Sequence, residues 1–419
     1  MIRLRRVLTL SLCLLVAVFT LSGCGQQHQS SSARVKITFW HGMVGAHKTA
    51  LNKIIRDFNQ SQSKYKVVGV SQGNFSNVQQ KITAAAKSHT LPTIAQTTYT
   101  NVPDYVKGGF ITSFDPYISS ADLSDIYPAF RQSIKYQGKS YAMPFSKSAQ
   151  ILYYNQDLLK KLNLSVPTTW EEMQKDSAIA KQQGYAGTVF DQSFISQLDG
   201  LSRQAGTTLM TSTPKKQFNV AKVTTATHVI WDMLQNGSAT TAGSDGYGDV
   251  PFLKGKTLFY TGSSAALAFM QSSTPKGMHW NTTPLPSYQG KQATSIAGND
   301  IVMFKSASKQ QRQGAAAFVK YLMSTKQTIR WAKASGYVPL TKSAQKNKSY
   351  QAYLTKHPYD QAALKSLDFG FQDRSFLGYN QYYSAVGKAI SKMATDHQTP
   401  EKTLPTLKQQ LVKIVKSNQ

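Results

Sequence analysis

The spacing of apolar residues changes along the chain, and the changes predict an alternation of strands and helices. Every second residue is apolar in VKITFW (residues 35–40), which indicates a β-strand. Residues 46–59 carry apolar side chains at helical spacing and predict an amphipathic helix. The same reasoning predicts strands over residues 65–73 and 93–98 and a helix over residues 77–88. This order is typical of an α/β lobe with a mostly parallel sheet, where ligands gather at the carboxyl ends of the strands.

The middle of the chain continues this alternation. Pro167 and a Thr cap precede a predicted helix that has two glutamates in its first turn. Related pieces lie far apart in sequence, so we expect two discontinuous lobes that are joined by crossing segments and separated by a hinged cleft. The predicted elements here are strands in AQILYYN (149–155) and AGNDIVMF (297–304), a strand that turns into a helix in KTLFYTGSSAALAFMQ (256–271), and a helix in QQRQGAAAFVKYLMS (310–324).

An uncharged apolar run near the N-terminus indicates export. It follows three arginines and is too short for the roughly 20 apolar residues of a membrane helix, so residues 1–23 are interpreted as a signal peptide, with an N-terminal anchor helix as the alternative. LSGC (residues 21–24) resembles a bacterial lipobox, which implies that Cys24 is lipidated and becomes the mature N-terminus. The polar residues 24–34 are then a flexible linker. We expect the protein on the extracellular face of the bacterial cell membrane, held there by its N-terminal lipid.

The chain has 48 Lys and Arg against 20 Asp and Glu, which gives a net charge of +28. Such an excess could serve nucleic-acid binding, but the lysines stand singly or in pairs and form no basic run. We therefore expect no nucleic-acid partner and attribute the charge to attraction toward an anionic cell surface. The chain is longer than one hydrophobic core usually organises, which favours two domains.

Motifs of catalysis are missing from the sequence. It contains no GxSxG, HExxH or GxxxxGK, and its 8 histidines are dispersed. A glycosidase needs two carboxylates that face each other, and no such pair is evident in sequence. We expect no enzyme, no catalytic residue, no metal and no cofactor. A secreted carbohydrate-active hydrolase and a cell-surface carbohydrate-binding adhesin remain the alternatives.

Six motifs resemble those of the extracellular solute-binding proteins of bacterial ABC importers. Within that family, the likeness is greatest to the group that binds glycerol 3-phosphate or sugars and includes maltose-binding protein. The resemblance covers residues 35 to about 390 and implies an α/β, two-lobe periplasmic-binding-protein-like fold (type II) with a hinged interlobe cleft. The motifs are ITFWHGM, PFSKSAQILYYNQDLL, PTTWEEM, FYTGSSAALA, AGNDIVMF and SGYVPLTKSA.

The same resemblance implies a domain organisation and partners. One lobe would comprise residues 35–147 plus 285–338, and the other residues 148–284 plus 339–419. The expected partners are a small-molecule solute and the membrane subunits of an ABC permease, and we expect a monomer. The solute would be glycerol 3-phosphate, a glycerophosphodiester or an oligosaccharide.

Binding residues follow from the resemblance position by position. The family's phosphate-binding Arg would fall near Ser384, where tyrosines stand instead, and tyrosine cannot replace a guanidinium. Rings suit the apolar face of a sugar or a quaternary ammonium, so glycerol 3-phosphate is in doubt. For Phe194, a core position and a position facing the solute are both open. The expected ligand-binding residues are Phe75, Tyr99, Ser148, Ser263, Gly298, Tyr337 and Tyr383.

Overall fold

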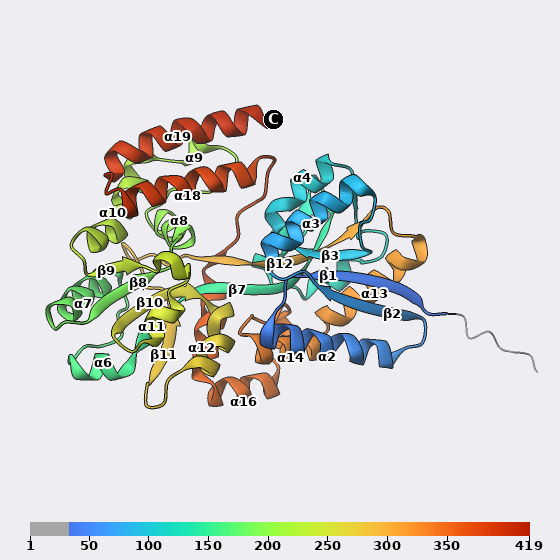
Figure 1. Cartoon of the computed structure of the whole chain (residues 1–419), viewed down its shortest axis with the longest axis horizontal. Helices are drawn as coiled ribbons and strands as arrows, with labels where there is room; N and C mark the ends of the chain where they lie inside the picture. The colour runs from blue at the N-terminus through green and yellow to red at the C-terminus, as the bar shows by residue number, and fades with distance from the viewer. Residues whose placement is uncertain (1–32) are drawn as a thin grey trace, which may run out of the picture.

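Two lobes share one continuous sheet in the computed structural model, which describes residues 33–419 (Figure 1). Cys24 and the predicted signal peptide, residues 1–23, lie outside the described residues. Strands β4 (Ile111–Thr112) and β13 (Gly370–Phe371) pair with β12, and β11 (Trp280–Pro284) pairs with β7. The order of its main strands is β2 (Tyr65–Ser71), β1 (Val35–His41), β3 (Ile94–Thr97), β12 (Thr294–Phe304), β7 (Ala142–Asn155), β10 (Thr257–Ser263), β8 (Ala186–Phe190) and β9 (Ala239–Thr241).

The first lobe is built on parallel strands. β1 pairs in parallel with both β2 and β3, as the alternating pattern predicts. The longest helix beside them, α2, buries Leu51, Ile54, Ile55 and Phe58 against this sheet, because these residues recur on one helical face. The helices of the first lobe are α2 (Gly45–Ser61), α3 (Phe75–Ser88), α4 (Val102–Lys107), α5 (Ser120–Ser124), α13 (Lys309–Met323) and α14 (Thr325–Ser335). A short 3₁₀ turn, η1 (Tyr99–Asn101), precedes α4.

β7 and β12 carry the sheet from one lobe into the other, and Figure 1 shows both strands crossing the centre of the molecule. The first half of β7 pairs antiparallel with β12, from Ala142 with Val302 to Ala149 with Ile296. Its second half pairs with β10 and β11. One uninterrupted strand of 14 residues therefore belongs to both lobes.

The second lobe has its own apolar core, in which α7 packs beside β8 and α10 beside β9, while α18 and α19 pack on each other (Figure 1). α7 begins at a complete capping box, since the Thr169 side chain accepts from the Glu172 amide and Glu172 reaches back. The helices of this lobe are α6 (Gln156–Lys161), α7 (Trp170–Gln182), α8 (Ile195–Gln204), α9 (Pro214–Gln217), α10 (Val220–Gln235), α11 (Asp249–Leu253), α12 (Leu267–Ser273), α18 (Tyr379–Thr395) and α19 (Pro400–Ser417).

Two segments connect the lobes, and their hydrogen bonds show which lobe each one lies against. Residues 285–293 lie against the second lobe, where Gln204 donates hydrogen bonds to the carbonyls of Pro286 and Ala293. The start of the segment that holds α15 (Lys342–Gln345), α16 (Lys348–Lys356) and α17 (Gln361–Lys365) lies against the first lobe. There the Tyr127 amide donates to the Leu340 carbonyl over 2.9 Å.

The observed architecture confirms the predicted α/β, two-lobed fold. Between residues 33 and 419, none of the helices combines the length and the apolar character that a membrane crossing requires.

Candidate functional site

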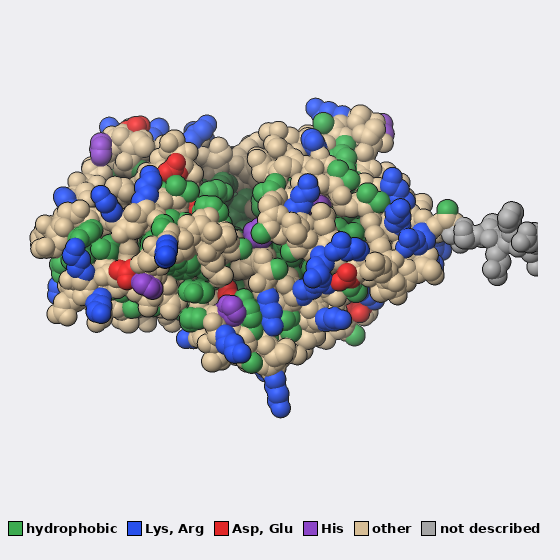
Figure 2. Space-filling view, turned by 60° about the horizontal axis from the view of Figure 1, so that its bottom comes forward, with side chains coloured by type: hydrophobic (Ala, Val, Ile, Leu, Met, Phe, Trp, Pro, Cys, Tyr) green, Lys and Arg blue, Asp and Glu red, His purple; other side chains and the backbone are tan. Residues whose placement is uncertain are grey.

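Two adjoining cavities lie where the lobes meet. The first has a volume of about 330 Å³ and the second about 420 Å³, and both are lined by Thr98, Ala297 and Gly298. Because the two cavities share these lining residues, they form two parts of one cleft. Figure 2 shows the molecule hollowed between its two halves, with hydrophobic side chains in the hollow.

All seven residues that the family resemblance implied line this cleft. They reach it from both lobes, as expected of a site between them. Whether they touch a solute stays a prediction. Tyr99, Gly298 and Tyr383 line the first cavity, and Phe75, Ser148, Ser263, Tyr337 and again Gly298 line the second.

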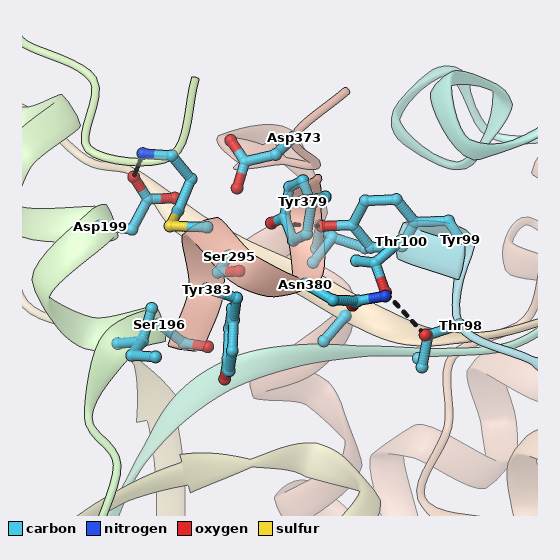
Figure 3. Close-up of a pocket in the computed structure, with 15 residues that line it drawn as sticks. Thr98, Tyr99, Thr100, Ser196, Asp199, Ser295, Asp373, Tyr379, Asn380 and Tyr383 are labelled. Atoms are coloured by element: carbon cyan, nitrogen blue, oxygen red, sulfur yellow. Dashed lines mark hydrogen bonds between the residues drawn. The ribbon is translucent and has the colours of Figure 1, made fainter. Parts of the chain in front are cut away.

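Tyrosines from opposite lobes meet in the first cavity (Figure 3). The hydroxyl of Tyr99, in η1, lies 3.3 Å from the hydroxyl of Tyr379, in α18, and the two rings pack edge to face. Next to them, Nδ2 of Asn380 donates a hydrogen bond of 2.8 Å to Oδ1 of Asn101. The lobes therefore contact each other directly across this end of the cleft.

Of the three tyrosines at the start of α18, two line the first cavity and one does not. Tyr379 and Tyr383 are one turn apart and both line the first cavity. Tyr382 does not line the cavity, is fully buried in the core of the second lobe, and donates to the carbonyl of Leu209 over 2.8 Å. Only two of the three rings are available to a solute.

Two buried carboxyl groups at the wall of the first cavity, Asp199 and Asp373 in Figure 3, share one arginine. Arg203 forms an ion pair with Asp373 and lies 3.9 Å from Asp199, its neighbour one turn earlier in α8. Burial raises the pKa of Asp199, and burial together with the charge of Asp199 raises the pKa of Asp373 well above its usual range. One guanidinium does not fully compensate two buried carboxylates.

Hydroxyl groups and rings line the second cavity. Ser263 donates a hydrogen bond of 3.0 Å to Ser148, which joins β10 to β7. Tyr337 is only 6% exposed and stacks on Trp331, with 6.0 Å between ring centroids. Burial raises the pKa of the Tyr337 hydroxyl, so this group stays a neutral hydrogen-bonding partner.

Gly298 lets the backbones of β12 and β7 come close together between the two cavities. Its φ is +121°, and a Cβ atom there would lie 2.0 Å from the carbonyl oxygen of Ser146. The register between the strands shifts just after it, between Asn299 and Asp300. Glycine is required here because any side chain would force the two strands apart.

A buried ion pair supports the strands behind the cleft. Nζ of Lys147 in β7 lies 2.9 Å from Oδ1 of Asp300 in β12, and both side chains are completely buried. The Ser133 hydroxyl donates to Asp300 and accepts from Lys147, each over 3.1 Å. Lys147 lies 5.9 Å from the Tyr99 ring centroid, but its charge is already matched by Asp300.

Several cleft residues were not identified from the sequence. All but Asn299, which stands in AGNDIVMF, lie outside the family motifs, in segments that only tertiary folding brings together. Phe194, left open above, is 2% exposed and belongs to the core. The additional cleft residues include Asp199, Tyr247, Asp249, Phe269, Asn299 and Asp373.

A family model described as bacterial extracellular solute-binding protein matches residues 53–357. The chain belongs to this family. Its curated relatives include the sn-glycerol-3-phosphate-binding periplasmic protein UgpB of Brucella abortus strain 2308. That protein is 27% identical over 351 residues, with 78% of this chain and 79% of the relative covered. UgpB of Rhizobium meliloti is 25% identical, with 82% and 84% covered.

Solved structures of other binding proteins share the fold of this solute-binding protein. The cyclic α-maltosyl-1,6-maltose-binding protein of Arthrobacter globiformis superposes with a TM-score of 0.80 at 22% identity, covering 92% of this chain and 100% of that one. UgpB of Mycobacterium tuberculosis, in complex with glycerophosphocholine, gives a TM-score of 0.79 at 19% identity, covering 91% and 98%. The predicted family and two-lobe fold are confirmed.

Proposed function

We propose that this solute-binding protein captures a sugar or a glycerol-derived solute in its interlobe cleft and delivers it to the membrane subunits of an ABC permease. The observation that carries the proposal is the convergence of seven motif-derived residues, from both lobes, on two adjoining cavities. A solute in that position contacts both lobes at once, so it stabilises the closed arrangement more than the open one. The permease then recognises the closed form.

The names of relatives support this range of solutes. Curated relatives are described as binding sn-glycerol 3-phosphate, and structural neighbours bind cyclic α-maltosyl-1,6-maltose or glycerophosphocholine. Among the described residues, neither cavity is lined by Lys, Arg or His. A phosphate monoester is usually held by such charges, so we propose that glycerol 3-phosphate is not the preferred solute.

The lobe boundaries belong to the same proposal. The family resemblance implies one crossing near residues 283–286, between lobes of residues 35–147 plus 285–338 and residues 148–284 plus 339–419. The contacts of residues 285–293 with the second lobe favour moving that crossing into β12, near Gly298. We retain the proposals of a monomer and of a lipid on Cys24 that holds the protein at the extracellular membrane face.

Calorimetric titration of the purified protein with a panel of sugars, glycerol 3-phosphate and glycerophosphodiesters tests the function. We expect one class to bind with 1:1 stoichiometry. Tyr383→Ala should then weaken binding more than about tenfold, because a stacked ring is lost. The melting temperature should change little, since Tyr383 is 43% exposed.

Ser384→Ala is the matched control, because Ser384 is the exposed neighbour on the same helix. It should bind as the unsubstituted protein does. Product analysis after long incubation with the same oligosaccharides should detect no turnover. Turnover would favour the hydrolase alternative, and a protein that binds no member of the panel would contradict the proposed function.

A further inference from the structure

The ionisable side chains that line the cleft are acidic, whereas the protein as a whole is basic. The chain carries a net charge of +28, and Figure 2 shows Lys and Arg side chains spread over the outer face. Yet the only charged side chains that line the cavities, within the described part of the chain, are Asp199, Asp373 and Asp249. In a chain so rich in lysine, a cleft with acidic groups alone indicates selection for the charge of its contents.

One buried side-chain oxygen in the cleft lacks a hydrogen-bond donor. The Asp373 carboxyl group has partners, since Oδ1 pairs with Arg203 and the carboxyl groups of Asp373 and Asp199 hydrogen-bond each other. Oδ1 of Asn299, in the second cavity, has no donor among the described residues. Asn299 is 2% exposed, so bulk water does not readily replace the missing donor. Buried acceptors are normally satisfied, so a donor from the solute is the natural partner.

Rings surround the acidic end of the cleft. Tyr99, Tyr379 and Tyr383 line the same cavity as the two carboxyl groups. The faces of aromatic rings attract cations, whereas carboxylates accept hydrogen bonds from them. A quaternary ammonium supplies charge but no N–H, while a neutral sugar supplies hydroxyl donors but no charge. A protonated amine supplies both.

We propose that the cleft selects a hydroxylated solute with a protonated amino group, such as an amino sugar, whose nitrogen lies between Asp199, Asp373 and the tyrosine rings. This inference rests on the proposed function and specifies its solute class. The hydroxyl groups of the solute face Ser148, Ser263 and Asn299 in the second cavity, which lies next to the first. Arg203 keeps one carboxylate paired, and the ammonium compensates the other.

Matched solutes test the proposal on the full-length protein. The panel pairs glucosamine, galactosamine and the β-1,4-linked glucosamine dimer with glucose, galactose, cellobiose and the N-acetylated forms, and adds glycerophosphocholine and glycerol 3-phosphate. At a pH where the amines are protonated, at least one amine should bind about tenfold or more tightly than its hydroxyl and acetyl counterparts. This advantage should disappear as the pH rises through the pKa of the bound amine.

Asp373→Asn tests the residue assignment. It removes the charge with little change in shape, so the amine should lose its advantage to within about threefold while the neutral counterpart is affected less. Asp368→Asn, an exposed aspartate close in sequence, is the matched control and should keep the full advantage. If Asp373→Asn unfolds, Asp199→Asn and the pH series on the unsubstituted protein provide the same comparison.

The outcomes separate this inference from the proposed function. Equal or tighter binding of a neutral or anionic solute would overturn the preference for an amine and leave the solute-binding function standing. Failure of every amine in the panel would also overturn the inference. If no compound in the panel binds at all, the proposed function fails with it.

Discussion

At the scale of single residues, the cleft depends on the position that glycine occupies at 298. Its φ of +121° and the carbonyl of Ser146 leave no space for a side chain. Both cavities are lined by this residue, so a shift of its backbone changes the whole cleft. The family motif could identify Gly298 as a site residue, but only the structure shows that its role is to allow two strands to approach.

Gly298→Ala should lower both stability and solute affinity. The strained backbone and the clash with Ser146 predict a loss of about 1–3 kcal/mol in the free energy of unfolding. Urea unfolding of the ligand-free protein measures this loss. Gly290→Ala is the control, because its φ is also positive at +70° but nothing lies within 4 Å of the added Cβ. Equal losses for the two variants would show that close approach at Gly298 is unimportant.

At the scale of elements, β7 and β12 combine a structural and a functional role. Their pairing carries the sheet between the lobes, and their bulge places Asn299 at the cleft and Asp300 beside Lys147. A buried ion pair is weak evidence for stability in general, because desolvation offsets the attraction. Here the pair also leaves the cleft without an available positive charge, since Lys147 is bound to Asp300.

Lys147→Met should destabilise the protein by about 3–5 kcal/mol, because it leaves Asp300 buried without its partner. The double variant Lys147→Met with Asp300→Leu should recover most of that loss, since no charge then remains buried. Guanidinium unfolding curves of both variants measure the effect. Lys139→Met, at an exposed position, should change the free energy of unfolding by no more than about 0.5 kcal/mol. A double variant as unstable as the single one would contradict this explanation.

The sequence predicts the helices and strands near the start of the first lobe well, but it does not predict α18. β1, α2, β2, α3 and β3 were predicted to within a few residues, because their apolar periods are regular and their pairing is local. α18 was not predicted as a helix, although its tyrosines at 379 and 383 have helical spacing. Asp199 and Asp373 could not be recognised as a pair from the sequence, since 173 residues separate them. The motifs therefore identified individual positions in the cleft. The acidic residues of the cleft come together only in the folded structure, so the motifs could not reveal them.

At the scale of the whole molecule, the lobes touch across the cleft as well as behind it. Tyr379 and Asn380 of α18 contact Tyr99 and Asn101 of the first lobe. These contacts favour the closed arrangement directly, by a small amount, since each hydrogen bond contributes about 0.5–1.5 kcal/mol. The solute therefore needs to supply only part of the closing free energy.

Asn380→Ala should shift the ligand-free protein toward an open form and weaken solute binding about 2- to 12-fold, as expected for one lost hydrogen bond. Small-angle scattering should show a larger radius of gyration without solute and an unchanged radius at saturation. Lys388→Ala, an exposed position on the same helix, should match the unsubstituted protein in both measurements. An unchanged radius and affinity for Asn380→Ala would show that the contact has no part in closure.

The place of β12 in the sheet determines when a newly made chain is able to fold. This strand lies between β3 and β7, so the space between those two strands stays unfilled until residue 304 has been synthesised. Any shorter nascent chain exposes unpaired strand edges, which are sites of aggregation. The sheet that spans both lobes is therefore completed only after more than two thirds of the chain has been made.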